Sequence, residues 1–158
     1  MAILIEPREL SAWRRGLPPS TRVAATNGCF DLLHVGHLAV LETGRQLGNV
    51  LLVGVNDDES IRELKGPSRP IMPLSDRLRL LMALACVDFV TWFSDVQAHG
   101  FLKVARPSVW FKGGDYTLDT MDQDERAALE NIGAQITFLP VIPGQSTSAI
   151  ITKIKALP

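Results

Sequence analysis

The chain has 158 residues, a length typical of one domain with a substantial core and short for two. Hydrophobic residues make up 46% of it and the formal net charge is -1, so a disordered chain and a general nucleic-acid-binding surface are both disfavoured. An anionic ligand would therefore have to be bound by a local cluster of positive charge.

Targeting and redox signals are weak. The first twenty residues contain Glu6 and Glu9 and no basic region ahead of an apolar run, which disfavours a secretory signal. No apolar stretch is long enough to span a membrane. Cys29 and Cys86 lack a CxxC spacing, so neither a disulfide framework nor a zinc ribbon is indicated. We expect a single domain over residues 1–158 in the cytoplasm, without a membrane partner.

The expected elements alternate between helices and strands. Residues 1–20 predict a short N-terminal helical extension. Short, continuously apolar runs, typical of strands buried on both faces, occur at 22–26 and 50–56, and further strands are predicted at 88–93, 108–111 and 135–140. Helices are predicted at 36–48, 75–87, 97–105, 121–133 and after residue 148. The sequence thus predicts an α/β fold, a Rossmann-like doubly wound parallel sheet of about five strands with helices on both faces.

The first core helix contains poor helix formers, Thr43 and Gly44. Glycine inside a helix costs about 1 kcal/mol relative to alanine, and close packing of the helix is one explanation for Gly44. Gly48 suits the C-cap of this helix, and Ser75 suits the N-cap of the next.

The stretch NGCFDLLHVGH joins the first strand to the first core helix. Gly28 permits a close turn, and Gly36 lets a ligand approach the free N–H groups of the helix start, which favour phosphate. His34 and His37 are three residues apart, so at the helix start they can face one point. There they can donate hydrogen bonds to phosphate oxygens and stabilise a five-coordinate phosphorus.

Two alternatives for the histidine pair stay open. A metal site would need a third ligand, which Cys29 or Asp31 could supply. A purely structural pair is the other.

The stretch NDDESIRELKGPSRP follows the second strand and carries Arg62, Lys65 and Arg69. A solvated basic loop is the plain interpretation. Because this stretch should open on the same sheet edge as the histidines, we favour a flexible lid whose cations hold phosphates. Arg77, in the next helix, either joins this lid or is an exposed helix arginine.

The last two strands are also followed by polar groups. In KGGDY the two glycines suit a backbone packed against a ligand, and Lys112 and Asp115 can reach polar groups, although the stretch is also a good turn. Residues 146–148, Ser-Thr-Ser, open the last helix. One hydroxyl is needed as the N-cap, and the other two are free to bind phosphate unless the cap is the whole role.

Phosphate-compatible groups thus follow four strands, whose carboxyl ends meet at one edge of a parallel sheet. The chain has no GxxxxGK[ST] loop and no GxGxxG, which disfavours a P-loop enzyme and a dinucleotide redox domain. It also has no Ser-His-Asp set or nucleophile elbow.

Together these stretches resemble the nucleotidyltransferase superfamily, whose signature is His-x-Gly-His and whose late motif is Ser-(Ser/Thr)-(Ser/Thr). Four separated motifs, TNGCFDLLHVGH, VGVNDDESIRELKGPSRPI, KGGDY and GQSTSAII, occur in order from about residue 22 to 154. They look most like the D-glycero-β-D-manno-heptose 1-phosphate adenylyltransferases, here as a free-standing domain.

The resemblance implies transfer of AMP from ATP to the heptose phosphate in one in-line displacement that releases pyrophosphate. It implies that His34, His37 and Lys65 are catalytic, that ATP carries Mg²⁺ without a named protein ligand, and that a homodimer is possible. Its implied binding residues are Asn27, Gly28, Cys29, Phe30, Gly36, Arg69, Arg77, Lys112, Gly113, Asp115, Ser146, Thr147 and Ser148.

The sequence also departs from related families. Cytidylyltransferases acting on glycerol 3-phosphate or phosphocholine typically carry an arginine where this chain has Val141. The stretch FSDVQAHGF departs from the pattern of the heptose enzymes, so the acceptor sugar stays open, and His99 within it is expected at the surface. A cytidylyltransferase acting on glycerol 3-phosphate, a non-catalytic nucleotide-binding module and a zinc protein remain the alternatives.

Overall fold

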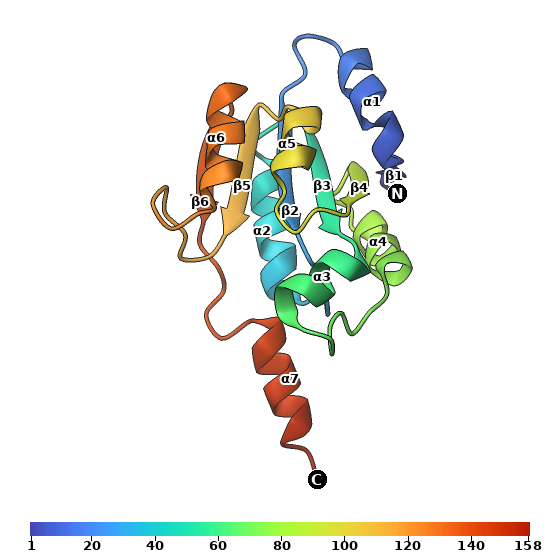
Figure 1. Ribbon diagram of the computed structural model, residues 1–158, viewed down its shortest axis with the longest axis vertical. Coiled ribbons are helices and arrows are strands. Elements are labelled where there is room, and N and C mark those ends of the chain that lie inside the picture. Colours follow the sequence, from blue (N-terminus) through green and yellow to red (C-terminus); the bar gives the residue numbers. More distant parts are fainter.

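A six-stranded parallel sheet organises the computed structural model, which describes residues 1–158 (Figure 1). Every strand pairing in it is parallel. Its order is β1-β4-β3-β2-β5-β6. The strands are β1 (Ile3–Leu4), β2 (Val23–Gly28), β3 (Val50–Asn56), β4 (Phe89–Phe93), β5 (Val109–Gly113) and β6 (Gln135–Leu139). The predicted α/β doubly wound fold is confirmed, with one strand more than the five expected.

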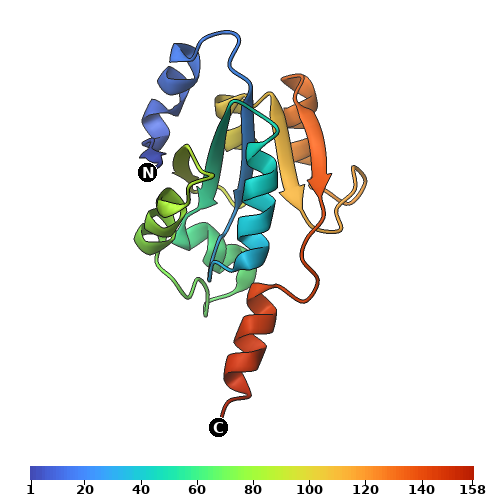
Figure 2. The same ribbon diagram turned by 180° about the vertical axis from the view of Figure 1, so that it is seen from behind.

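Helices cover both faces of the sheet (Figures 1 and 2). They are the 3-10 helix η1 (Pro7–Glu9), α1 (Leu10–Gly16), α2 (Val35–Arg45), α3 (Asp58–Lys65), α4 (Leu74–Ala83), α5 (His99–Ala105), α6 (Gln123–Asn131) and α7 (Thr147–Lys155). Apolar residues of α1, α5 and α6 pack with Val23 and Ala25 on one face, and those of α2 and α4 pack with Ala24 on the other. Because both faces are buried, the central strands are continuously apolar rather than alternating.

The register brings the ends of the central strands together. β2 pairs with β3 from Val23 opposite Val50 to Gly28 opposite Val55. The loops after these strands therefore start at the same edge, where α2 begins and α3 lies (Figure 1).

The N-terminal extension contains a strand as well as helices. Ile3 and Leu4 pair with Phe89 and Val90 of β4 and form one edge of the sheet. Two residues are too few to show the pattern of apolar side chains that marks a strand, so the sequence indicated only the helix.

Three local predictions need correction. The stretch after β3, where no helix was expected, begins with α3, whose start is capped by the Asp57 carboxylate, which accepts a hydrogen bond from the Ser60 N–H; its role as a lid stays a prediction. The N-cap of α4 is Pro73, because that helix begins before Ser75. α2 ends at Arg45, ahead of the expected Gly48 cap.

Gly44 has the predicted packing explanation. A Cβ atom at this position would overlap the Phe111 ring of β5, so α2 approaches the sheet too closely for any side chain.

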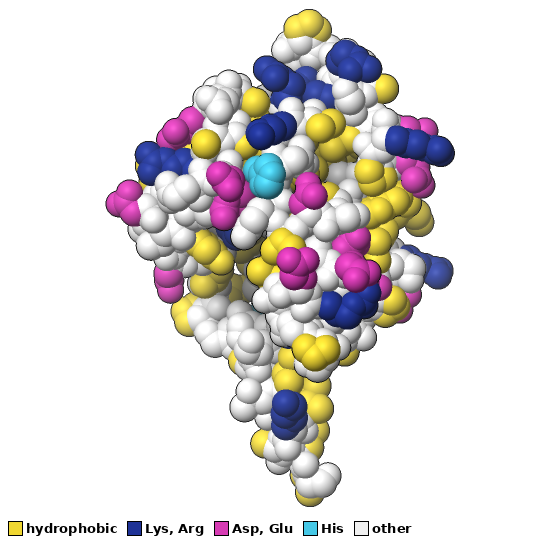
Figure 3. All heavy atoms as spheres, in the orientation of Figure 1, with side chains coloured by type: hydrophobic (Ala, Val, Ile, Leu, Met, Phe, Trp, Pro, Cys, Tyr) yellow, Lys and Arg dark blue, Asp and Glu magenta, His cyan; other side chains and the backbone are white.

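α7 projects from the rest of the molecule at the carboxyl edge of the sheet (Figures 1 and 2). None of its residues is buried, and hydrophobic side chains such as Ile154 lie exposed along it (Figure 3). Neither α7 nor any other helix has the length and apolar character needed to cross a membrane.

Candidate active site

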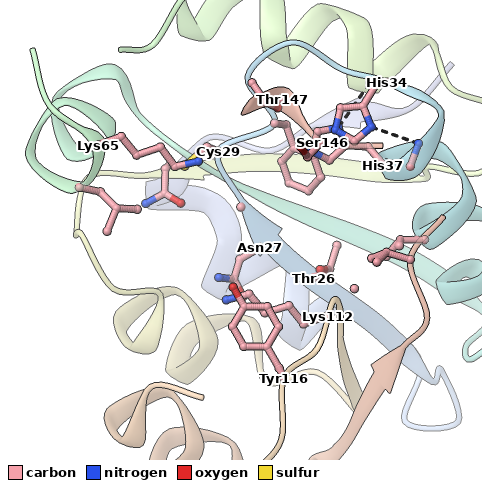
Figure 4. A pocket seen from close by; sticks show the side chains of 18 of the residues that line it. Thr26, Asn27, Cys29, His34, His37, Lys65, Lys112, Tyr116, Ser146 and Thr147 are labelled. Carbon is pink, nitrogen blue, oxygen red and sulfur yellow. Dashed lines mark hydrogen bonds between the residues drawn. The ribbon is translucent and has the colours of Figure 1, made fainter. Parts of the chain in front are cut away.

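A cavity of about 690 Å³ opens at the carboxyl edge of the sheet, a volume in the usual range for small-molecule sites (Figure 4). The starts of α2 and α7, the end of α3 and the ends of β2, β3 and β5 contribute to its wall. The sequence-predicted residues that line it are Asn27, Gly28, Cys29, Phe30, His34, Gly36, His37, Lys65, Arg69, Lys112, Gly113, Ser146, Thr147 and Ser148.

The two histidines cap α2 with their Nδ1 atoms. His34 is the N-cap, and its Nδ1 accepts a hydrogen bond from the Gly36 N–H at 3.1 Å. Nδ1 of His37 accepts from the His34 N–H at 3.4 Å. The ring centroids lie 3.9 Å apart. Because an Nδ1 that accepts a hydrogen bond carries no proton, a neutral ring holds its proton on Nε2, where it is free to donate to a ligand.

Burial keeps both imidazoles neutral. It lowers the pKa of His34, and together with the neighbouring His34 and Lys65 it lowers the pKa of His37 to about 4. At neutral pH the pair therefore supplies hydrogen-bond donors without positive charge. The positive charge in the cavity wall comes from Lys65, Arg69 and Lys112.

Gly36 makes room for the His34 ring. A Cβ atom at this position would lie 2.9 Å from Nδ1 and Cε1 of His34 and 3.2 Å from Cβ of Gln145, just before α7. The glycine of HVGH thus allows the cap and brings the starts of α2 and α7 together.

Asp31 connects three segments of the site, and sequence reasoning considered it only as a metal ligand. Its carboxylate is buried, with the residue 2% exposed, and it accepts hydrogen bonds from Arg69 Nε at 2.7 Å and from the N–H groups of Ile71 and Met72. Its backbone oxygen accepts from Thr147 Oγ1 at 2.8 Å. The residue joins the loop after β2 to the segment after α3 and to the start of α7.

The hydrogen bonds to Asp31 also determine its charge. Burial alone would raise the pKa of this carboxyl, but the bonds from Ile71, Met72 and Arg69 outweigh burial and lower it. Asp31 is therefore ionised at neutral pH and holds the Arg69 guanidinium at the cavity, with Arg69 Nη2 unpaired within the chain.

The backbone around Asp31 is strained. Phe30 has φ 49° and Leu32 has φ 55°, both in the left-handed region that bulky residues avoid. Such residues cost on the order of 1–3 kcal/mol each and persist where the surroundings hold them, as the buried bonds of Asp31 do here.

Arg77 does not reach the cavity. It is 0% exposed, and its guanidinium donates hydrogen bonds to the backbone oxygens of Met72, Cys29 and Asn56 and to Oδ1 of Asp58. It is neither a lid residue nor an exposed helix arginine. It ties the carboxyl ends of β2 and β3 to α3, because α4 turns this side chain towards the sheet.

The KGGDY stretch contributes a tyrosine rather than its aspartate. Asp115 is exposed and outside the cavity wall, whereas Tyr116 lines it. Nζ of Lys112 lies 4.7 Å from the centre of the Tyr116 ring. Trp110 Nε1 donates to Oδ1 of Asn27 at 2.7 Å, which leaves the Asn27 amide nitrogen unpaired for a ligand.

One hydroxyl at the start of α7 is unbound, not two. Ser146 Oγ is the N-cap and accepts from the Ala149 N–H, and the Thr147 hydroxyl donates to Asp31. Ser148 makes no side-chain hydrogen bond. The helix start still presents its first N–H groups, which have no intrahelical partner.

Sequence reasoning missed six polar residues of the cavity wall: Thr26, Asn56, Gln97, Tyr116, Glu125 and Gln145. Asn56 and Gln97 follow strands, and that position was a usable signal. Glu125 lies within a helix and gives no such signal. His99, expected at the surface, is half-buried and lies outside the cavity wall.

Residues 25–153 match the family model described as cytidylyltransferase-like. The chain belongs to this family. It is 46% identical over 131 residues to the bifunctional protein HldE of Streptomyces coelicolor and 44% identical over 133 residues to that of Geobacter sulfurreducens. The matches cover 83% and 84% of this chain, but only 28% and 27% of those proteins. The resemblance drawn from the motifs is confirmed, and the chain is a nucleotidyltransferase.

Solved structures share the fold. A lipopolysaccharide core biosynthesis protein from Thermoplasma volcanium GSS1 superposes with a TM-score of 0.64 at 23% identity, over 78% of this chain and 98% of that one. A pantoate-beta-alanine ligase from Francisella tularensis gives 0.62 at 12% identity, over 94% and 69%. At these identities the likeness concerns the architecture alone.

Proposed function

We propose that this nucleotidyltransferase transfers AMP from ATP to D-glycero-β-D-manno-heptose 1-phosphate, giving ADP-heptose and pyrophosphate. The observation that carries the proposal is the meeting of His34 and His37, both with free Nε2–H groups, with the start of α7 and with Lys65 and Arg69 in one cavity. Such a site suits a polyphosphate that gains charge during the reaction.

The reaction is an in-line displacement. An oxygen of the acceptor phosphate attacks the α-phosphorus of ATP, and the bond from that phosphorus to the oxygen bridging to the β-phosphate breaks. The chain then needs no nucleophile of its own, only positioning and charge stabilisation. His34 and His37 donate from Nε2 to the phosphate oxygens, and these hydrogen bonds strengthen as charge accumulates.

The leaving pyrophosphate faces the cations and α7. Lys65, at the end of α3, and Arg69, oriented by Asp31, neutralise the β- and γ-phosphates. The first N–H groups of α7 and the Ser148 hydroxyl add donors. ATP enters with its Mg²⁺ as part of the substrate, and the metal offsets phosphate charge. We assign no protein ligand to it, since the Asp31 carboxylate is already bonded to Arg69.

The heptose acceptor and the adenine base rest on the sequence motifs and on the HldE relatives. Transfer of CMP to glycerol 3-phosphate is the second candidate, because the matching family model is described as cytidylyltransferase-like. Val141 argues against it, since those enzymes typically carry an arginine there. The cytoplasm, where ATP is abundant, is the compartment we propose.

Pyrophosphate release in a crossed panel tests the proposal. ATP and CTP are each combined with Mg²⁺ and with heptose 1-phosphate, hexose 1-phosphates or glycerol 3-phosphate, and products are identified by mass. We expect release with ATP and heptose 1-phosphate. Turnover of CTP with glycerol 3-phosphate instead would establish the second candidate. ATP binding without release from any pair would indicate a non-catalytic nucleotide-binding module.

A further inference from the structure

A buried carboxylate lies in the cavity wall on the side opposite the histidines. Glu125 belongs to α6, which covers one face of the sheet, whereas His34 and His37 belong to α2 on the other face. Glu125 is 3% exposed, and no cation pairs with it. Its one hydrogen bond comes from the Ala98 N–H to Oε1 at 3.0 Å. The second carboxylate oxygen has no partner within the chain.

The hydrogen bond at the start of α5 explains only one of the two carboxylate oxygens. Ala98 is the N-cap of α5, and Oε1 of Glu125 accepts a hydrogen bond from its backbone N–H, the bond that the N3 side chain makes in a capping box. A neutral amide oxygen would serve equally well. Burying a charged group costs free energy unless its lone pairs are satisfied, and the second oxygen, which lines the cavity without a donor from the chain, is open to a donor on a ligand.

The neighbouring groups favour hydroxyls as that donor. Asn56 uses its amide nitrogen on Ser60 and on the backbone oxygens of Asp95 and Val96, which leaves its side-chain oxygen to accept. Two acceptor groups repel phosphate and suit a ligand rich in O–H groups.

Phosphate can bind nearby at Lys112. Its Nζ forms no ion pair and lies over the Tyr116 ring, at the end of the cavity away from His34, Ser146 and Thr147 (Figure 4). Gln97, which makes no side-chain hydrogen bond, also lines the cavity beside Ala98. Cation, acceptors and a free amide together match a polyhydroxylated phosphate.

In-line geometry assigns this end to the acceptor. The attacking oxygen must approach the α-phosphorus from the side opposite the leaving pyrophosphate, which faces Lys65 and the start of α7. The opposite side of the cavity is the one that holds Lys112 and Glu125.

We propose that Glu125 and Gln97 are specificity-determining residues that bind the hydroxyls of a polyol phosphate acceptor, while Lys112 binds its phosphate. The inference rests on the proposed function and adds the acceptor subsite to it. It also places Gln97, from the stretch that departs from the heptose family pattern, in contact with the sugar.

Glu125→Gln tests the inference. The amide oxygen keeps the bond from Ala98, and an NH₂ group replaces the acceptor that faces the cavity. We expect the KM for heptose 1-phosphate to rise about tenfold to a hundredfold, the range for loss of a hydrogen bond to a charged group, with ATP affinity unchanged. Asp124→Asn, which removes an exposed charge from the same helix, should leave both parameters near wild type.

Deoxy acceptors separate recognition from a structural role. For at least one monodeoxy sugar 1-phosphate, the KM of the wild-type enzyme should rise by the same factor by which Glu125→Gln raises the KM for the full sugar. With that deoxy sugar, the KM of the variant should rise little further. If the substitution and the missing hydroxyl raise the KM independently for every deoxy acceptor, the inference is overturned.

A second variant covers a folding defect. If Glu125→Gln melts well below wild type, the test rests on Gln97→Ala alone. The Gln97 side chain forms no hydrogen bond in the fold, so its removal should leave stability unchanged. Gln97→Ala should raise the KM for the acceptor at least fivefold. An unchanged acceptor KM in the folded variant overturns the acceptor subsite while leaving the proposed function intact. A wild-type enzyme that uses no polyol phosphate overturns both.

Discussion

Two helix starts face the same cavity, and they are built differently. α2 is part of the core, with Leu41 and Gly44 buried, and an imidazole caps it. α7 has no buried residue, and a serine hydroxyl caps it. Backbone N–H groups of both can bind phosphate, but only α2 holds its donors rigidly. Rigid donors suit the phosphorus that gains charge in the transition state, whereas a loosely held helix suits a product that must leave.

A single side-chain hydrogen bond connects α7 to the rest of the site, from Thr147 to the backbone oxygen of Asp31. Through this bond the start of α7 is fixed to the loop that joins β2 to α2. If this comparison is right, changes at α2 should alter the chemical step, and changes at α7 should alter local opening and nucleotide binding.

The largest effect is expected from His34→Asn. The asparagine oxygen can cap α2 in place of Nδ1, but no donor remains at the position of Nε2. Pyrophosphate release should fall on the order of 10²- to 10³-fold, as for loss of one donor to a developing oxyanion, with the melting temperature nearly unchanged. His99→Asn, at the histidine outside the cavity wall, is the control and should stay near wild type. A matching loss of stability would instead mean that His34 only caps the helix.

A graded effect is expected from pH. The pKa of His37 falls from 6.5 to about 4 on folding, so between these values the unfolded chain binds a proton that the native chain does not. Above pH 6.5 the ring is neutral in both states, and His37 does not make stability depend on pH. Below pH 6.5 only the unfolded chain is protonated there, so the free energy of unfolding falls as the pH is lowered towards 4.

Urea unfolding at a series of pH values measures this slope, and His37→Gln should have a shallower slope across the same window. An NMR titration of His37 should give a midpoint far below 6.5. Equal slopes in the two proteins, or an ordinary midpoint, would contradict the buried, neutral ring.

The smallest effect is expected from Thr147→Val, which removes the hydroxyl and keeps the shape. Loss of this hydrogen bond should cost about 1 kcal/mol of local stability. Amide exchange in α7 should quicken about fivefold while exchange in α2 stays the same, and the KM for ATP should rise a few-fold. Thr152→Val makes the same change where the threonine side chain forms no hydrogen bond. Equal effects of the two variants would reject the tie to Asp31.

Much of the fold could be predicted because its signals are local. The buried strands β2 and β3 are short, continuous apolar runs, and their ends indicated the edge at which phosphate groups gather. β1 and α3 were missed for the same reason. Two paired residues show no periodicity, and the eight residues of α3 contain only Ile61 and Leu64 as large apolar side chains.

The candidate site divides along similar lines. Arg69 and Arg77 look alike in the sequence, yet one lies at the cavity beside Asp31 and the other is fully buried among backbone oxygens of three segments. The side chain of a long polar residue finds its partners through space, so spacing along the chain could not separate the two.

The sequence by itself determined the layered α/β fold, the edge that carries the site and the HVGH helix start, because each depends on residues within a few positions of one another. Only the tertiary structure decided the protonated nitrogens of the two rings, the role of Asp31, and the meeting of Glu125 and Lys112 in one cavity. Those features depend on burial and on partners brought from distant segments, which acquire their positions only when the sheet and its helices have packed.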